Sequence, residues 1–391
     1  MTLWDKGTPL DPAVLAYTAG EDHALDNRLV PHDVRASIAH AEMLAAQGLL
    51  EQAALEAIVR GLRALADEHG RGVWRVELED EDVHGALERR LTARIGPDGG
   101  RLQLGRSRND QVLAALRLYL KEAVAALAER AREVAAALHT LGEAHADLPL
   151  PGYTHGQRAM PSSVPLWAGG FATELEDDAQ GLAACLRRID RNPLGSAAGY
   201  GTPGLPVDRE HTRVALGFAR TQEPVTAVQL SRGKAESQVI FEVALLSSDL
   251  GRLAADLVLF STSEFGFVEL PEEMTTGSSF MPQKKNPDLF ELARGRSASA
   301  LAALVEALSI PAKLPSGYHR DLQLLKVPLF RALDQAQDTC ALFAAALPRV
   351  RFRPERLTLG PELFAAEEAC RLVRVEGIPF REAYRRVAEQ V

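Results

Sequence analysis

Residues 277–288, Gly-Ser-Ser-Phe-Met-Pro-Gln-Lys-Lys-Asn-Pro-Asp (hereafter the serine–lysine loop), combine side chains that can move a proton beside a negatively charged substrate. The hydroxyls of Ser278 and Ser279 can act as acid or base, and Lys284 is one of two adjacent positive charges. Asn286 suits the N-cap of a helix, and the proline after it suits the first helical position. Because a helix N-terminus beside lysines binds carboxylates well, the pattern predicts a mobile loop that closes on a substrate with several carboxylates.

A second polar stretch, Gly-Arg-Ser-Arg-Asn-Asp-Gln at residues 105–111, precedes the longest periodic apolar segment of the chain. Arg106 and Arg108 can hold carboxylates through paired hydrogen bonds. Asn109 or Asp110 can cap the helix that follows. An ordinary charged helix start has the same pattern, so the stretch indicates a binding site only in combination with the serine–lysine loop.

Two histidines stand among polar neighbours. His155 lies in a turn bounded by proline and glycine, beside the hydroxyl of Thr154 and the amide of Gln157, which favours substrate binding over simple solvation. His84 stands four residues before Glu88, as in some metal sites. No further ligand has suitable spacing, so we predict no metal and no cofactor, and we expect His84 near the substrate.

Helical periodicity dominates the rest of the chain, and strand signals such as residues 73–76 are short and few. The predicted stripes are Leu116, Leu120, Val124, Leu127, Ala131, Val134, Leu138 and Leu141 in a helix over about 110–146; Ile240, Val243, Leu246, Leu250, Leu253, Leu257 and Phe260; and Leu301, Leu304 and Leu308. Residues 161–189 are a fourth candidate helix. The pattern predicts an all-α fold whose long helices form a bundle completed by neighbouring subunits, with a monomeric bundle as the alternative.

Composition limits the classes of function. Of 391 residues 46% are apolar, enough for a large core, and a net charge of −9 argues against nonspecific binding of nucleic acid. No apolar stretch is long enough to span a membrane, and the N-terminus lacks the pattern of a signal peptide. The three cysteines are scattered and fit a reducing compartment. We therefore predict a cytoplasmic protein with a small-molecule substrate and no nucleic-acid or membrane partner.

Breaks rich in proline and glycine near residues 96–100 and 148–152 interrupt the helical pattern. They suggest an N-terminal helical domain at 1–104, a central helical bundle at 105–346 and a short C-terminal helical domain at 347–391.

The serine–lysine loop is similar to the signature of the fumarase/aspartase superfamily, Gly-Ser-Ser-x-x-Pro-x-Lys-x-Asn, at every fixed position. Residues 105–110 resemble the Gly-Arg-Ser-Arg-Asn-Asp motif that sets argininosuccinate lyases apart within it, and residues 192–201 and 314–326 look like a bacterial subgroup of those enzymes. The resemblance covers the chain to about residue 385. It implies a fumarase/aspartase-like fold, a homotetramer with shared active sites, and the elimination of fumarate from argininosuccinate to release arginine in arginine biosynthesis.

The resemblance also implies individual roles. Ser278 is the expected base, with Ser279 as second choice, and His155 held by Glu291 is the expected acid. Lys284 stabilises the carboxylate that gains negative charge. The residues that match the family's substrate contacts are Asp26, Asp82, His84, Arg108, Asn109, Thr154, Gln157, Arg232, Asn286, Tyr318, Gln323 and Lys326.

The chain departs from the family pattern in three places. Gln103 and Leu104 stand where the family usually has His-Thr or His-Ser, and Gly156 replaces a leucine. Family members also carry several tens more residues after the position of Val391, which predicts a shortened C-terminus.

Three alternatives remain. A related fumarate-releasing lyase, such as an adenylosuccinate lyase or a fumarase, typically has Lys-Arg-Asn or Lys-Val-Asn in the loop instead of Lys-Lys-Asn. A non-catalytic structural homologue, as in lens crystallins, has no need of the serine, histidine and lysine kept here. An unrelated scaffold of long helices is the third.

Overall fold

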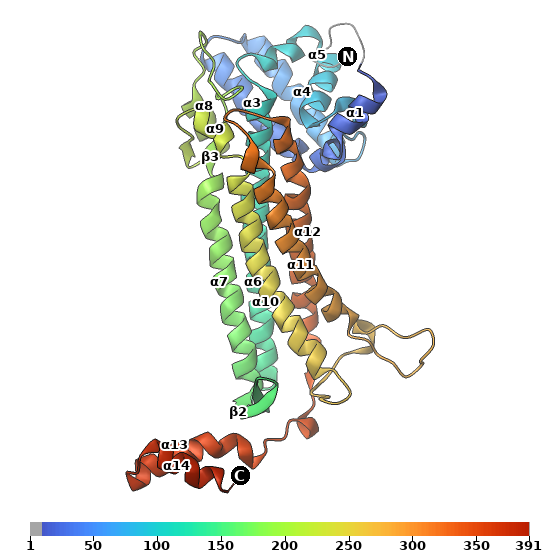
Figure 1. Ribbon diagram of the computed structural model, residues 1–391. Helices are drawn as coiled ribbons and strands as arrows, with labels where there is room; N and C mark the ends of the chain where they lie inside the picture. Colours follow the sequence, from blue (N-terminus) through green and yellow to red (C-terminus); the bar gives the residue numbers. More distant parts are fainter. Residues whose placement is uncertain (1–9, 391) are drawn as a thin grey trace. The chain divides into compact units, whose positions relative to one another are not determined.

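The computed structural model describes residues 10–390, and its regular structure is almost entirely helical (Figure 1). The helices are α1 (Pro12–Ala19), α2 (Asp22–Leu25), α3 (Val30–Ala46), α4 (Gln52–Gly70), α5 (Val83–Ile95), α6 (Arg108–Ala144), α7 (Val164–Ile189), α8 (Arg209–Leu216), α9 (Thr226–Leu230), α10 (Lys234–Phe260), α11 (Asp288–Ser309), α12 (Lys326–Ala346), α13 (Ala365–Glu376) and α14 (Phe380–Ala388). The predicted all-α class is confirmed.

Strands within the described residues form only two-stranded pairs. They are β1 (Pro149–Thr154) with β2 (Gln157–Ser163), β3 (Arg191–Asn192) with β4 (Arg220–Thr221), and β5 (Val268–Glu269) with β6 (Arg351–Phe352). The first and third pairs are antiparallel and the second is parallel.

The chain divides into two compact units. The first comprises the chain up to Ala126 with Leu182–Glu242 and Leu301–Leu333, and the second comprises Leu127–Gly181, Val243–Ala300 and the chain from Asp334 on. The long helices α6, α7, α10, α11 and α12 each contribute residues to both units. This division differs from the domain boundaries near residues 104 and 346, which stay predictions.

Small side chains let the helices of the first unit approach closely. A buried cluster joins α3, α6 and α8 through Ala36, Ala39, Ala114, Leu118, Leu194, Leu216 and Phe218. On α4, a Cβ added at Gly61 would lie 2.6 Å from the side chain of Leu91 on α5, so a larger residue here would force Leu91 to move. The close packing fixes the ends of α5 and α6, on which several of the predicted site residues stand.

The start of α6 depends on Ser107. Its Oγ accepts from the backbone N–H of Asn109 at 3.3 Å, and its own N–H donates to Oδ1 of Asp110 at 3.0 Å, so the side chains of Ser107 and Asp110 together cap the helix start. The helix therefore begins at Arg108, and the prediction that Asn109 or Asp110 is the N-cap is wrong. With its other oxygen, Asp110 accepts from the backbone N–H groups of residues 195 and 197 and ties that segment to the helix start.

The predicted apolar stripes of α6 and α10 are confirmed, because every residue named in them is buried. The stripe on α11 differs. Leu301 and Leu308 are 59% and 55% exposed, while Ala303 and Ala307 form the buried face of that helix in the first unit. The α11 leucines are therefore available to a neighbouring molecule, as the expectation of a bundle completed by other subunits requires.

Two local predictions of secondary structure are wrong. Residues 73–76 form no strand, because Trp74 instead packs its ring against His69 and donates its indole N–H to the carbonyl of Leu65 at 2.9 Å. Helix α7 begins at Val164 and not near residue 161, because residues 161–163 belong to strand β2.

Candidate active site

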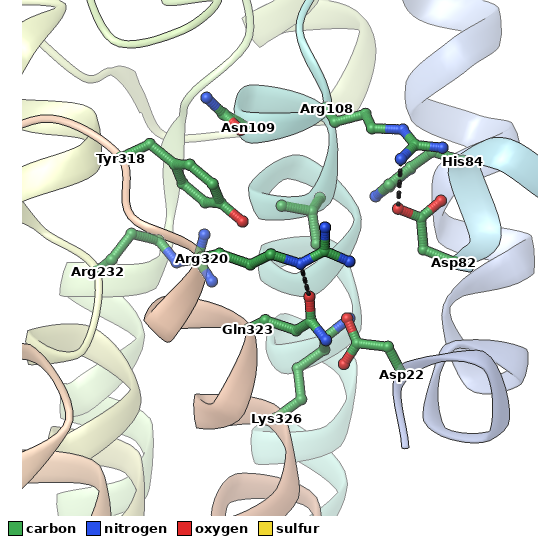
Figure 2. Close-up of a pocket in the computed structure, with 11 residues that line it drawn as sticks. Asp22, Asp82, His84, Arg108, Asn109, Arg232, Tyr318, Arg320, Gln323 and Lys326 are labelled. Atoms are coloured by element: carbon green, nitrogen blue, oxygen red, sulfur yellow. Dashed lines mark hydrogen bonds and ion pairs between the residues drawn. The ribbon is translucent and has the colours of Figure 1, made fainter. Parts of the chain in front are cut away.

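A pocket of about 220 Å³ lies in the first unit. It is formed by the start of α2, the starts of α5 and α6, the turn just before α10, and the segment that leads into the first residue of α12 (Figure 2). Its lining residues are Asp22, Asp82, His84, Arg108, Asn109, Val112, Arg232, Tyr318, Arg320, Gln323 and Lys326. Most of the predicted substrate contacts therefore meet in one place, although they come from segments as far apart as residues 82 and 326.

Lys326 is buried in the floor of the pocket between two carboxylates. Its Nζ lies 2.6 Å from Oδ1 of Asp26 and 2.8 Å from Oδ2 of Asp22. Burial disfavours the ammonium, but the two negative charges outweigh it and raise the pKa of Lys326 to about 12. Burial raises the pKa of Asp22 to about 7, against the opposing attraction of Lys326. Asp26 is held in turn by the backbone N–H of Val83, at 3.1 Å from its Oδ2.

His84 forms a buried pair with Asp33. Its Nδ1 lies 2.8 Å from Oδ2 of Asp33, which also accepts from the side-chain amide of Gln111. Burial opposes both charges, but each partner stabilises the other, so the pKa of His84 is raised and that of Asp33 is lowered. The opposite ring nitrogen, Nε2, is buried without a hydrogen-bond partner among the described residues. His84 thus has a ring nitrogen free for a ligand in the pocket, and its raised pKa favours the protonated, donating form.

Arg108 lies between the pocket and two acidic residues. Its Nη1 is 3.6 Å from Oδ2 of Asp82 and 3.7 Å from Oε2 of Glu81. Asp82 is the N-cap of α5 and accepts from the backbone N–H of Gly85 at 2.8 Å. A Cβ at Gly85 would meet the carbonyl oxygen of Asp80 at 2.4 Å, so glycine is needed for this close approach.

Arg232 is almost fully buried and only partly satisfied. Its Nε donates to Oε1 of Glu236 at 3.3 Å, and its Nη2 donates to the carbonyl of Leu322 at 3.1 Å. The remaining nitrogen, Nη1, has no partner among the described residues. A buried guanidinium N–H without an acceptor is costly, so this group predicts a bound carboxylate in the pocket.

The segment before α12 closes the pocket from the other side. Arg320 donates from Nε to Oε1 of Gln323 at 3.3 Å, and both side chains also donate to the carbonyl of Thr18. Figure 2 shows the hydroxyl of Tyr318 and the guanidinium of Arg320 directed into the middle of the pocket. These two groups add a neutral donor and a positive charge on the side opposite His84.

The serine–lysine loop belongs to the second unit. Thr276 and Asn286 exchange backbone hydrogen bonds of 3.1 and 2.9 Å, which pin the two ends of the loop together, while Phe280 at its tip is 89% exposed. The helix after the loop begins at Asp288, and the side chain of Asn286 donates to Thr276 and Gly277. The predicted N-cap role of Asn286 is therefore wrong, since it fixes the loop base instead.

Within the loop the two serines differ. The Oγ of Ser278 accepts from the backbone N–H groups of Phe280 and Met281 at 3.2 and 3.1 Å. The side chain of Ser279 has no such contact described and is exposed. Donors directed at an oxygen favour its negatively charged form, so Ser278 is the better placed of the two to lose its proton. Lys284 is exposed, and Lys285 pairs with Glu272 at 2.9 Å.

His155 lies in the turn of the hairpin formed by β1 and β2, in the second unit. Its φ is 53° and that of Gly156 is 71°, as a two-residue turn of type I′ requires. This explains why glycine replaces the leucine usual in the family, because glycine adopts positive φ without strain. Thr154 and Gln157 pair across the turn, and all of these side chains are exposed. No contact described for residues 10–390 joins His155 to Glu291, and their pairing stays a prediction.

Sequence reasoning missed three residues that line the pocket, Asp22, Val112 and Arg320. Arg320 falls inside residues 314–326, which resemble the family, so its charge was the available signal. Asp22 stands four residues before Asp26, one helical turn away, and a search for a second carboxylate at that spacing would have found it. Val112 is apolar and has no such signal.

Comparison with known proteins identifies the family of the chain. A family model described as Lyase matches residues 10–301. The argininosuccinate lyase of Sorangium cellulosum is 47% identical over all of this chain, which covers 90% of that relative. The chain belongs to the argininosuccinate lyase family. The argininosuccinate lyase of Thermotoga neapolitana is 39% identical, and the alignment covers 99% of this chain and 98% of that relative.

Solved structures share the fold of this argininosuccinate lyase family member. An EDDS lyase crystallised with formate matches with a TM-score of 0.80 and 25% identity over 97% of this chain and 76% of that one. The class II fumarase of Schistosoma mansoni matches with a TM-score of 0.81 and 17% identity over 97% of this chain and 89% of that one. The predicted fumarase/aspartase-like fold is confirmed.

Two further findings concern other kinds of site. Among residues 10–390, no group of three or more His, Cys, Asp or Glu side chains is arranged to hold a metal ion. In the same part of the chain, every helix is too short or too polar to cross a membrane.

Proposed function

We propose that this chain is an argininosuccinate lyase that eliminates fumarate from argininosuccinate and releases arginine. The observation that carries the proposal is the pocket itself, where buried nitrogens of His84 and Arg232 without a hydrogen-bond partner among the described residues accompany Arg108. Argininosuccinate carries three carboxylates, and buried cationic donors without acceptors suit such a ligand. The relatives named argininosuccinate lyase, each similar over nearly the whole chain, support the same reaction.

The chemical step needs a base at the carbon next to a carboxylate. We assign this role to Ser278, whose Oγ already accepts two backbone N–H groups that would stabilise an alkoxide. Removal of the proton leaves an aci-carboxylate with an extra negative charge. Lys284 and Asn286 of the same loop provide positive potential and a hydrogen bond to that group, which lowers the barrier because the charge grows in the transition state.

The carbon–nitrogen bond then breaks, and the electron pair leaves on the guanidinium nitrogen. His155 is the proposed acid that gives this nitrogen a proton, directly or through water, with Glu291 supporting its basicity and Thr154 and Gln157 contacting the substrate. The exposed position of His155 at a hairpin turn suits a group that completes a site on another subunit.

We propose a homotetramer whose active sites combine residues of different subunits. The exposed apolar residues Leu301, Val305 and Leu308 follow one face of α11 at helical spacing and support burial against another copy. The exposed serine–lysine loop and the exposed turn at His155 are then brought to the pocket of a neighbouring chain. We also propose a role in arginine biosynthesis and a cytoplasmic location, in agreement with the buried free thiols Cys185 and Cys340.

A substrate panel tests the proposal. The purified protein is incubated separately with argininosuccinate, adenylosuccinate, malate and aspartate, and fumarate is measured by chromatography. We expect fumarate and arginine in equal amounts from argininosuccinate and no fumarate from the others. Fumarate from adenylosuccinate or malate alone would replace the proposal with a related lyase, and no product from any substrate would favour a non-catalytic homologue.

A further inference from the structure

A second cavity in the first unit has a concentration of positive charge that the proposed reaction does not use. It has a volume of about 340 Å³, and we call it the basic cavity. Its charged lining residues are Arg188, Arg191 and Lys234, and the polar ones are Gln222 and Ser231. None of its lining residues belongs to the substrate pocket.

The cations of the basic cavity lack negative partners. No ion pair described for residues 10–390 involves Arg188, Arg191 or Lys234, and the same holds for the neighbouring Arg187 and Arg220. The nearby carboxylate of Asp190 is occupied by Lys121, whose Nζ lies 2.6 Å from its Oδ1. In a protein with net charge −9, these three lining cations and the two neighbouring arginines form a local concentration of positive charge.

Arg191 is the residue that most needs an acceptor. Its Nε is buried and has no hydrogen-bond partner among the described residues. Burial lowers the pKa of Arg191, and the repulsion of Arg220, Arg188 and Arg187 lowers it further. A bound anion would supply the missing acceptor and reduce this repulsion.

The walls of the cavity are already held in place. Buried Arg117 donates from Nη1 to the carbonyl of Arg191 at 2.7 Å and from Nη2 to Oγ of Ser231 at 2.9 Å. The segment carrying Arg191 also pairs with residues 220–221 in the β3–β4 ladder. Because these contacts order the cavity without a ligand, an anion would bind with little loss of conformational freedom.

Helix-end electrostatics explains only part of this charge. Arg187 and Arg188 lie in the last turn of α7, where cations complement the helix dipole. Arg191 lies beyond that helix, and Arg220 lies in strand β4, so this effect does not apply to them. Lys234 stands at the first residue of α10, where the helix dipole adds further positive potential and makes the site more attractive to an anion.

We propose that the basic cavity is a binding site for a small oxyanion with at least two negative charges, of the phosphate, pyrophosphate or polycarboxylate class. Planar guanidinium groups match the paired oxygens of these anions. Ser231 lines this cavity, and the next residue, Arg232, lines the substrate pocket. The bound anion and the substrate would therefore contact adjacent residues of the chain.

Calorimetric titration with pyrophosphate, at an ionic strength held constant with chloride, tests the proposal. We expect saturable binding to the wild-type protein in the absence of substrate. Arg191→Gln, which removes a side chain with no described hydrogen bond, should weaken binding by roughly tenfold or more. Lys234→Gln is a second, exposed position expected to weaken it as well. Citrate in place of pyrophosphate distinguishes a polycarboxylate site from a phosphate site.

Two matched variants locate the site. Arg63→Gln removes one exposed arginine on α4, and Arg108→Gln removes an arginine of the substrate pocket. Both should bind pyrophosphate as the wild type does. The proposal is overturned if the wild type shows no saturable binding, if Arg191→Gln and Lys234→Gln bind normally, or if only Arg108→Gln loses binding. Because the titration uses no substrate, its failure would leave the proposed lyase activity unaffected.

Discussion

Nζ of Lys326 lies 2.6 Å from Oδ1 of Asp26, a residue 300 positions earlier in the chain. Both side chains are buried, and Asp22 contacts the same ammonium from the neighbouring helical turn. This contact joins the start of α12 to the N-terminal helices and forms the floor of the substrate pocket. The pair therefore has a structural role as well as a place in the site.

Lys326→Met should destabilise the protein by about 3 kcal/mol, because it leaves Asp26 buried without its cation. Urea unfolding followed by circular dichroism at pH 7 measures the change. Lys313→Met, which removes an exposed lysine, is the matched control and should change stability by less than about 0.5 kcal/mol. The double variant Lys326→Met with Asp26→Asn should recover part of the loss. If Lys326→Met were as stable as the control Lys313→Met, the ion pair would contribute nothing to the stability of the fold.

The pair of His84 and Asp33 predicts a pH-dependent contribution to stability. Because the pKa of His84 is raised in the folded protein, its charge stabilises the fold fully below about pH 6.5, the pKa of histidine in an unfolded chain. This stabilisation is lost as pH rises through the folded pKa. Because the pKa of Asp33 is lowered in the folded protein, its charge stabilises the fold fully above about pH 3.9, the pKa of aspartate in an unfolded chain. This stabilisation is lost as pH falls through the folded pKa. The pair therefore stabilises the fold most between these two limits.

His84→Gln measures this contribution. The difference in unfolding free energy between wild type and variant should be larger at about pH 5.5 than at about pH 9. Above its usual pKa of about 6.5 the imidazole of the unfolded chain loses its proton, while the raised pKa of folded His84 favours keeping it, so the stabilisation falls as pH rises. Urea unfolding at the two pH values gives the comparison, and His139→Gln, at an exposed histidine of α6, is the control. A difference that does not change with pH would mean that His84 is not charged in the folded protein.

Lys284→Arg should lower kcat strongly and leave KM unchanged or reduced, even though only seven of the chain's 44 basic residues are lysines. A compact ammonium can follow the charge that grows on one carboxylate oxygen, whereas the planar guanidinium favours the ground-state carboxylate. Steady-state kinetics on argininosuccinate provide the measurement, with Lys285→Arg as the neighbouring control. If the variant keeps more than about a tenth of wild-type kcat, a cost below about 1.4 kcal/mol, then Lys284 acts only as a positive charge.

Mixing two inactive variants tests whether active sites are shared. If His155 and Lys284 act in one site from different subunits, then His155→Gln and Lys284→Met should regain part of the wild-type activity when they are unfolded together and refolded. Each variant refolded alone is the control and should stay inactive. A monomer by light scattering, or no recovery in the mixture, would contradict the proposed composite site.

Long helices were predictable from the sequence because their signal is repeated many times. The stripes of α6 and α10 each continue over several turns without proline, so a period of 3.6 residues identifies both the helix and its buried face. The stripe on α11 had the same period but faces outward in the single chain, as Leu301 shows. Periodicity indicates that a face is apolar, but it does not indicate which molecule covers it.

Candidate site residues were named where motifs fixed both the residue type and its spacing. Arg108, Arg232 and Tyr318, named in this way, lie together in one pocket, and their contacts with substrate stay a prediction. Local caps were harder. Ser107, not Asn109 or Asp110, is the N-cap of α6, because the cap depends on which side chain reaches which backbone N–H. The β1–β2 hairpin was missed because its proline-rich strands lack alternating polarity, although His155-Gly156 has the positive φ angles of a tight turn.

The most direct test of the central claim uses Ser278→Ala. Single-turnover measurements of fumarate formation from argininosuccinate are combined with equilibrium binding of the same substrate, and Ser279→Ala is the control. We predict that Ser278→Ala lowers the rate of fumarate formation by roughly three orders of magnitude or more, while binding stays near the wild-type value because the carboxylates are held by other groups. A near-normal rate in Ser278→Ala with a severe loss in Ser279→Ala would move the role to Ser279, and near-normal rates in both would contradict a serine base.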